Sequence, residues 1–109
     1  MPKAYLVKED NGEKIPIHSH LIIGRTKECN LVIEDPAVSR KHFELVLSEN
    51  SYKWKDLGST NGTFINGQKM LSGELHSGDT VQIGKTLFRF EIEENSIPSK
   101  ISEKTDTKE

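Results

Sequence analysis

Turn-forming residues interrupt this chain at short intervals and restrict it to short secondary-structure elements. Six clusters of Gly, Asn, Asp, Pro or Ser lie between the apolar stretches: Asp10-Asn11-Gly12, Asp35-Pro36, Asn61-Gly62, Asn66-Gly67, Ser72-Gly73 and Ser77-Gly78-Asp79. Gly and Asn accept positive φ angles and Pro presets φ, so each cluster favours a tight turn. No segment long enough for a stable helix, about 12 residues, shows helical periodicity without such a breaker.

Between the turns, apolar and polar side chains alternate with the period of a strand that buries one face. Tyr52 and Trp54 alternate with Lys53 and Lys55, which predicts that both aromatic residues lie in the core. Further runs of this kind are Tyr5–Val7, Ile15–Ile17, Leu21–Ile23, Leu31–Ile33, Phe43–Leu47, Val81–Ile83 and Phe88–Ile92. Many short strands separated by turns predict an all-β sandwich or barrel.

The composition narrows the class of protein further. A chain of 109 residues suits one domain and excludes a two-domain enzyme. No apolar run approaches the roughly 20 residues of a membrane-spanning helix, and residues 1–8 lack the apolar stretch of a signal peptide. We therefore expect a cytoplasmic protein. Cys29 is the single cysteine, which excludes an internal disulfide, and the net charge of −2 argues against nucleic-acid or membrane binding.

The last residues differ in composition from the rest. Beyond residue 93 only Ile97 and Ile101 are apolar, so this segment cannot bury enough surface to offset its chain entropy. We predict a domain over residues 1–93 and a disordered polar tail over residues 94–109. An inert, solvated tail is the favoured interpretation. The alternative is that Thr105 or Thr107, once phosphorylated, binds to a domain of this kind, either within the same chain or, more readily, head-to-tail in a second copy.

Three polar clusters fall in predicted loops, and loops gather at the two ends of a sandwich. They are Gly24-Arg25-Thr26, Ser39-Arg40-Lys41-His42 and Gly58-Ser59-Thr60-Asn61-Gly62-Thr63. Together they supply cations, hydroxyl groups and amides on a flexible backbone. Such a group suits an anion with several oxygens, above all phosphate, because the forked donors of Arg match its geometry.

The order of the motifs resembles the signature of the forkhead-associated (FHA) domain. The resemblance covers residues 3–93 and rests on Gly24-Arg25, Ser39-x-x-His42, Asn61-Gly62-Thr63, Asn66-Gly67, Gly78-Asp79 and Gly84. It implies an eleven-strand β-sandwich with its binding loops at one end. It also implies a module that binds phosphothreonine in a protein or peptide. We expect this module to act in signalling as a monomer, without enzymatic activity, cofactor or metal.

The resemblance also implies roles for individual residues. Arg25 takes the position that pairs with the phosphate, and Ser39 the position whose hydroxyl bonds a phosphate oxygen. Arg40 and Thr60 match positions that complete the phosphate site, and Asn61 matches the one that bonds the peptide backbone. The residues expected to support the binding loops are Gly24, His42, Gly62, Asn66 and Gly67.

Other functions have weaker support in the sequence. Ser39, His42 and Asp35 could suggest a catalytic triad, but no nucleophile elbow surrounds Ser39. His18 and His20 have strand-like spacing but no evident third metal ligand. Two other kinds of binding remain as alternatives: a scaffold module that does not depend on phosphate, and a nucleic-acid binder that uses Arg40, Lys41 and nearby lysines.

Overall fold

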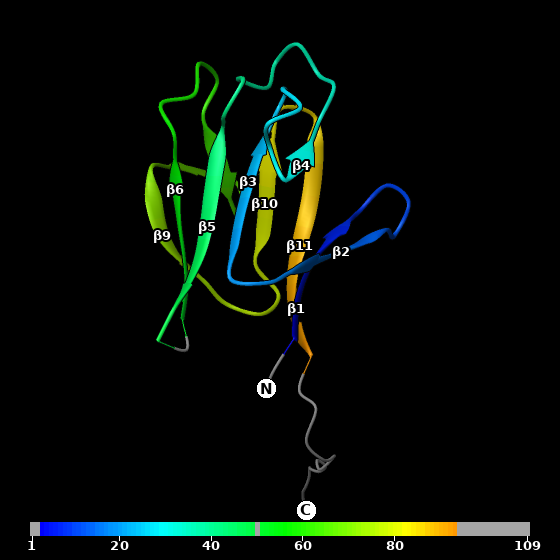
Figure 1. Ribbon diagram of the computed structural model, residues 1–109, viewed down its shortest axis with the longest axis vertical. Coiled ribbons are helices and arrows are strands. Elements are labelled where there is room, and N and C mark those ends of the chain that lie inside the picture. Colours follow the sequence, from blue (N-terminus) through cyan, green and yellow to red (C-terminus); the bar gives the residue numbers. More distant parts are fainter. Residues whose placement is uncertain (1–2, 50, 94–109) are drawn as a thin grey trace, which may run out of the picture.

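A computed structural model describes residues 3–49 and 51–93 of the chain, and within them the backbone forms eleven β-strands in two sheets (Figure 1). One sheet has, in spatial order, β2 (Lys14–Ile17), β1 (Lys3–Lys8), β11 (Thr86–Glu93), β10 (Thr80–Ile83), β7 (Thr63–Ile65) and β8 (Gln68–Met70). The other has β4 (Leu31–Val32), β3 (His20–Gly24), β5 (Phe43–Ser48), β6 (Ser51–Asp56) and β9 (Ser72–Leu75). The predicted all-β class and the sandwich are therefore confirmed.

Strand pairing follows the alternation seen in the sequence. All neighbouring strands are antiparallel except β3 and β4, which pair in parallel through Ile23 and Leu31. Pro16 lies in β2 at the edge of its sheet, where the missing backbone N–H of proline removes no interior hydrogen bond.

Within the described residues there is no helix, and hence none long and apolar enough to cross a membrane.

The core fills the space between the two sheets. Tyr52 on β6 contacts Phe90 on β11 edge to face, with ring centroids 5.2 Å apart, so this pair joins the two sheets. Phe43 and Trp54 stack within one sheet at 5.5 Å. Burying one large apolar side chain of this kind contributes about 1.5–3 kcal/mol. The prediction that Tyr52 and Trp54 are core residues is confirmed, since only 6% and 3% of their surfaces are exposed.

One predicted turn is wrong. Ser72-Gly73 lies inside β9, where Gly73 pairs with Trp54. A Cβ atom at Gly73 would lie 3.2 Å from the indole Nε1 of Trp54. The glycine therefore leaves room for the large ring of Trp54. Besides a bulge or bend, the close approach of another group is a common reason for glycine in a strand.

The three polar clusters meet at one end of the sandwich. In Figure 1 the connections β3–β4, β4–β5 and β6–β7 lie together at the top, whereas β1 begins and β11 ends at the bottom. Residues 94–109, the predicted tail with Thr105 and Thr107, lie outside the described residues. The expected division into domain and tail therefore stays a prediction.

Candidate functional site

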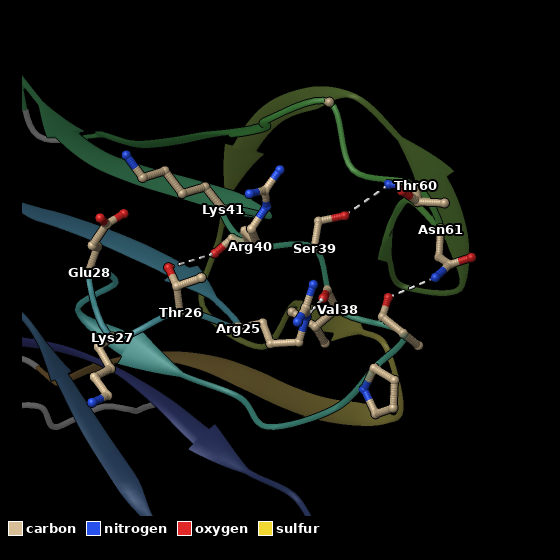
Figure 2. Close-up of a pocket in the computed structure, with 13 residues that line it drawn as sticks. Arg25, Thr26, Lys27, Glu28, Val38, Ser39, Arg40, Lys41, Thr60 and Asn61 are labelled. Atoms are coloured by element: carbon tan, nitrogen blue, oxygen red, sulfur yellow. Dashed lines mark hydrogen bonds between the residues drawn. The ribbon is translucent and has the colours of Figure 1, made fainter.

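A depression of about 900 Å³ opens at this end of the molecule (Figure 2). Its walls come from the three connections that carry the polar clusters: residues 25–28, residues 36–41, and the segment around Gly58, Thr60 and Asn61. The structure therefore brings Arg25, Ser39, Arg40, Thr60 and Asn61 to one site. These are the five residues expected to bind the phosphopeptide.

His42 lies beneath this depression and joins its walls. Its side chain is fully buried, its Nδ1 accepts a hydrogen bond from the backbone N–H of Ser39 (3.1 Å), and its Nε2 lies 2.8 Å from the carbonyl of Gly62. Because Nδ1 accepts, the proton of the neutral ring sits on Nε2, which donates to Gly62. One imidazole thus holds the β4–β5 connection against the β6–β7 connection.

Gly24 allows two of the walls to approach closely. A Cβ atom at this position would lie 2.1 Å from the carbonyl oxygen of Arg40 and 2.7 Å from the Sγ of Cys29. No side chain fits there, and the backbone N–H of Arg25 donates to the Arg40 carbonyl at 3.1 Å. Cys29, the single cysteine, is buried and donates from Sγ to the same carbonyl at 3.1 Å.

Arg25 is held in place by its own guanidinium. Its Nε donates to the carbonyl of Val38 at 2.9 Å. The guanidinium has five N–H donors, so four remain for a ligand after this bond. In Figure 2 the guanidinium of Arg25 lies close to Ser39, in the middle of the depression.

The hydroxyl of Ser39 is also oriented. Its oxygen accepts a hydrogen bond from the backbone N–H of Thr60 at 3.0 Å, which leaves the hydroxyl proton to donate elsewhere. Thr60 is an exposed residue, and its side chain lies beyond this hydrogen bond as seen from Ser39 (Figure 2). Ser39 therefore links two walls and offers one donor to the depression.

Asn61 contacts the wall that carries Ala37. Its Nδ2 donates to the carbonyl of Ala37 at 2.8 Å, so its side-chain oxygen and second N–H remain for a peptide backbone. Asp35 fixes that wall by accepting from the backbone N–H groups of Ala37 and Lys85, both at 2.9 Å. These two bonds, first that from Ala37, lower the pKa of the Asp35 carboxyl below its ordinary value of 3.8.

Asp56 organises the β6–β7 connection, and sequence reasoning missed it. Its carboxylate accepts from the backbone N–H and the hydroxyl of Ser59 (2.7 and 2.6 Å) and from the hydroxyl of Thr63 (2.8 Å). Burial raises the pKa of Asp56, but the hydrogen bonds from Ser59 and Thr63 outweigh it, so the pKa lies below 3.8. Its position after an alternating strand and before Gly58 is the signal that could have indicated a turn-forming Asp.

Ser59 was grouped with the neutral donors of the site but faces the protein interior instead. Its hydroxyl donates to Asp56 and accepts from the backbone N–H of Gly62 at 2.9 Å. Lys41 lines the depression together with Thr26, Lys27 and Glu28. The motif spacing alone did not assign these residues to the site.

Asn66 and Gly67 lie at the opposite end of β7 from the binding loops. They form the two-residue turn between β7 and β8, with φ angles of 51° and 84° that favour Asn and Gly. The side-chain oxygen of Asn66 accepts from the backbone N–H of Thr80 at 3.0 Å. The pair fixes the hairpin and the β9–β10 connection, and the hydrogen bonds of Asn66 in the described residues go to Asp79 and Thr80, not to residues that line the depression, so the expected support of the binding loops has no hydrogen bond behind it.

The alternative chemistries have no matching geometry in the described residues. The ring of His42 contacts the backbone N–H of Ser39 and not its hydroxyl, and both carboxylate oxygens of Asp35 accept from backbone N–H groups. His18 lies between β2 and β3, while His20 contacts Glu44. Among residues 3–49 and 51–93, no three His, Cys, Asp or Glu side chains gather as metal ligands would.

Comparison with known proteins identifies the family. The FHA domain model matches residues 21–84, more than half of the chain. The chain therefore belongs to the FHA domain family.

The chain is also similar to individual proteins. The glycogen accumulation regulator GarA of Mycobacterium tuberculosis is 42% identical over 62 residues, which are 57% of this chain and 38% of GarA. The chain thus spans less than half the length of the curated relatives it matches. Mycobacterium tuberculosis EmbR, solved with a low-affinity phosphopeptide, superposes with a TM-score of 0.82 at 28% identity, over 87% of this chain and 26% of EmbR. The MEK1 FHA domain, solved with a phosphothreonine peptide of HOP1, gives a TM-score of 0.68 at 29% identity, over 82% and 95% of the two chains.

Proposed function

We propose that this chain is a recognition module in signalling that binds proteins or peptides through a phosphorylated threonine, with Arg25, Ser39, Arg40, Thr60 and Asn61 as the contacting residues. It has no catalytic role in this proposal. Its partner is a threonine-phosphorylated protein, and it requires no cofactor, metal, nucleic acid or membrane.

The chemistry of the depression supports this function. A phosphothreonine carries a charge of about −1.5 to −2 near neutral pH and three strong acceptor oxygens. Arg25 and Arg40 supply the matching positive charge, and the hydroxyls of Ser39 and Thr60 supply neutral donors. Charge-assisted hydrogen bonds are about twice as strong as neutral ones, so the two guanidinium groups favour phosphate over a carboxylate.

The single observation that carries the proposal is the orientation of these donors without a ligand. Arg25 is anchored on Val38, the Ser39 hydroxyl is anchored by Thr60, and Asn61 is anchored on Ala37. Donors that are already fixed lose little conformational entropy on binding. Such preorganisation is what a site for a specific anion requires.

The relatives support the same conclusion. EmbR and the MEK1 FHA domain were solved with phosphopeptides, and GarA is named as a regulator and not as an enzyme. We further propose a cytoplasmic monomer. Val32, Val46 and Leu87, three of the exposed large apolar side chains in the described residues, lie on three different strands, and the other two, Met70 and Leu71, are adjacent at the end of β8, so no large apolar patch supports self-association.

Calorimetry with three matched peptides tests the proposal. The peptides share one sequence and carry phosphothreonine, phosphoserine or unmodified threonine. We expect measurable affinity for the phosphothreonine peptide, weaker affinity for the phosphoserine peptide and none for the unmodified one. Equal binding of the modified and unmodified peptides would instead identify a scaffold module that does not depend on phosphate.

A further inference from the structure

The depression carries more positive charge than a phosphothreonine can neutralise. Its lining contains four cations, Arg25, Lys27, Arg40 and Lys41, and one carboxylate, Glu28, for a net charge of +3. The whole chain has a net charge of −2, so everything outside the lining carries −5. Positive charge is therefore concentrated at this site, and a dianionic phosphate leaves about +1 of it unmatched.

The surplus charge lies at one end of the depression. Figure 2 shows Arg25, Arg40 and Ser39 in the middle, Lys27, Glu28 and Lys41 on one side, and Asn61 on the other. The side that carries Asn61 also includes Thr60 (Figure 2) and Ala37, whose carbonyl accepts a hydrogen bond from Asn61, and neither has a charge. The depression thus has a basic end and a neutral end.

The backbone holds the two lysines on the same rim. The carbonyl of Arg40 accepts from the backbone N–H of Arg25, from the hydroxyl of Thr26 at 3.4 Å and from the thiol of Cys29. Lys41 is the residue after Arg40. Lys27 lies in the loop of residues 25–29, which these contacts attach to the Arg40 carbonyl.

Both lysines are available to a ligand. Both lysines are exposed residues. In the part of the chain that the structure describes, no carboxylate lies within 4.0 Å of either ammonium group. Lys55, on the outer face of a sheet, has instead a partner in Glu44 at 3.7 Å. At the basic end, Glu28 offsets one of the two positive charges, and one remains.

We propose that Lys27 and Lys41 make the site selective for phosphothreonine flanked on one side by acidic residues, Asp or Glu. This inference rests on the proposed function, because the phosphate occupies the middle of the depression between Arg25 and Arg40. The flank that runs over the basic end then meets the two ammonium groups. The other flank runs past Ala37 and Asn61 and gains nothing from negative charge.

Three phosphothreonine peptides of equal length test this selectivity. One has neutral flanks, one has three Glu residues before the phosphothreonine, and one has three Glu residues after it. Exposed ion pairs contribute little individually, so we expect one acidic peptide to bind about five-fold tighter than the neutral peptide at low salt. The other acidic peptide binds within about two-fold of the neutral one. At 1 M salt, where the Debye length is about 3 Å, the advantage disappears.

Substitutions assign the effect to the two lysines. Lys27→Gln with Lys41→Gln removes the preference for the acidic flank, so that in this variant the acidic and neutral peptides bind within about two-fold of each other. The matched control, Lys14→Gln with Lys53→Gln, removes the same charge outside the depression and keeps the preference. Glu28→Gln strengthens the preference, because it removes the opposing charge.

The outcomes separate this inference from the proposed function. If the three phosphopeptides bind equally, or if the preference survives the Lys27→Gln and Lys41→Gln changes, the selectivity is wrong and phosphothreonine binding stands. If none of the three peptides binds, the proposed function fails and the selectivity fails with it.

Discussion

Arg25 combines an exposed position with a fixed geometry. Its Nε is bonded to Val38, so its remaining donors point into the depression without a ligand to hold them. We predict that Arg25→Ala lowers phosphopeptide affinity at least ten-fold, because one charge-assisted bond contributes about 1.5–3 kcal/mol. Arg25→Lys keeps the charge but not the forked donors, and should recover only part of the loss.

Calorimetry measures these affinities, and circular dichroism checks that each variant keeps its strands. The Arg25→Ala variant should melt close to the parent, because the Arg25 side chain is exposed. Parental affinity in Arg25→Ala would show that the phosphate binds elsewhere.

His42, unlike Arg25, is buried, and we assign it no contact with the ligand. His42→Ala leaves the N–H of Ser39 and the carbonyl of Gly62 without their partner and opens a cavity. We expect a loss of about 2–4 kcal/mol in the free energy of unfolding, which lowers Tm by roughly 10 °C or more. The affinity of the molecules that remain folded should change less.

Thermal unfolding of His42→Ala beside His76→Ala gives the comparison, because 72% of the His76 side chain is exposed. His76→Ala should melt like the parent. A His42→Ala variant that also melts like the parent but fails to bind would mean that His42 contacts the ligand.

Single residues differed in how well the sequence predicted them. Arg25, Ser39 and Asn61 could be selected because they stand in motifs whose order and spacing resemble a family. Ser59 and Lys41 could not be placed, because the sequence does not say which side of a loop a side chain faces. Ser59 faces Asp56 beneath the loop, and Lys41 faces the depression.

At the scale of elements, the β6–β7 connection depends on one buried charge. The Asp56 side chain is 3% exposed and anchors Ser59 and Thr63. Its pKa is lower in the folded protein than the ordinary 3.8, so the unfolded state binds the proton more readily. The stabilisation is complete above about pH 4–5 and is lost as the pH falls through 3.8 towards the folded-state pKa.

We predict that Asp56→Asn is less stable than the parent at neutral pH and that its stability falls less steeply between pH 5 and pH 3. The asparagine Nδ2 cannot accept the hydrogen bonds that a carboxylate oxygen accepts. Denaturant unfolding across this pH range measures the difference, with Asp10→Asn, an exposed acid in the β1–β2 connection, as the control. Parallel pH profiles for Asp56→Asn and the parent would contradict the role of Asp56.

Elements were predictable where alternation or turn chemistry was strong. The alternation over Tyr52–Lys55 and Phe88–Ile92 predicted β6 and β11, and Asn66-Gly67 predicted the hairpin turn. Gly73 was assigned to a turn because its actual cause, the ring of Trp54 on the neighbouring strand, is a long-range contact. The parallel pairing of β4 with β3 likewise depends on tertiary structure and leaves no local pattern.

For the whole molecule, we predict that residues 1–93 contain both the folded domain and the binding site. Removal of residues 94–109 should therefore lower the free energy of unfolding by less than about 0.5 kcal/mol. A change of this size leaves Tm unchanged within about 2 °C. It should also leave phosphopeptide affinity unchanged. Melting and calorimetry of the shortened chain check both expectations, and a large drop in either would mean that the last residues pack on the domain or complete the site.

Phosphorylation of Thr105 or Thr107 tests the alternative in which the tail occupies the site. If the tail is inert, the phosphorylated chain stays a monomer by mass in solution and binds a free phosphopeptide as the unmodified chain does. Dimers, or weaker binding of the free peptide, would instead show that the domain binds its own tail.

The most direct test of the central claim is to locate a bound phosphothreonine peptide by amide chemical shifts in solution. The account predicts that the largest changes fall on Arg25, Ser39, Arg40, Thr60 and Asn61, and that the unphosphorylated peptide produces none of them. The β7–β8 turn at Asn66-Gly67, at the other end of β7, should stay unchanged. Changes centred on a sheet face or on that turn, with the five residues unaffected, would contradict the account.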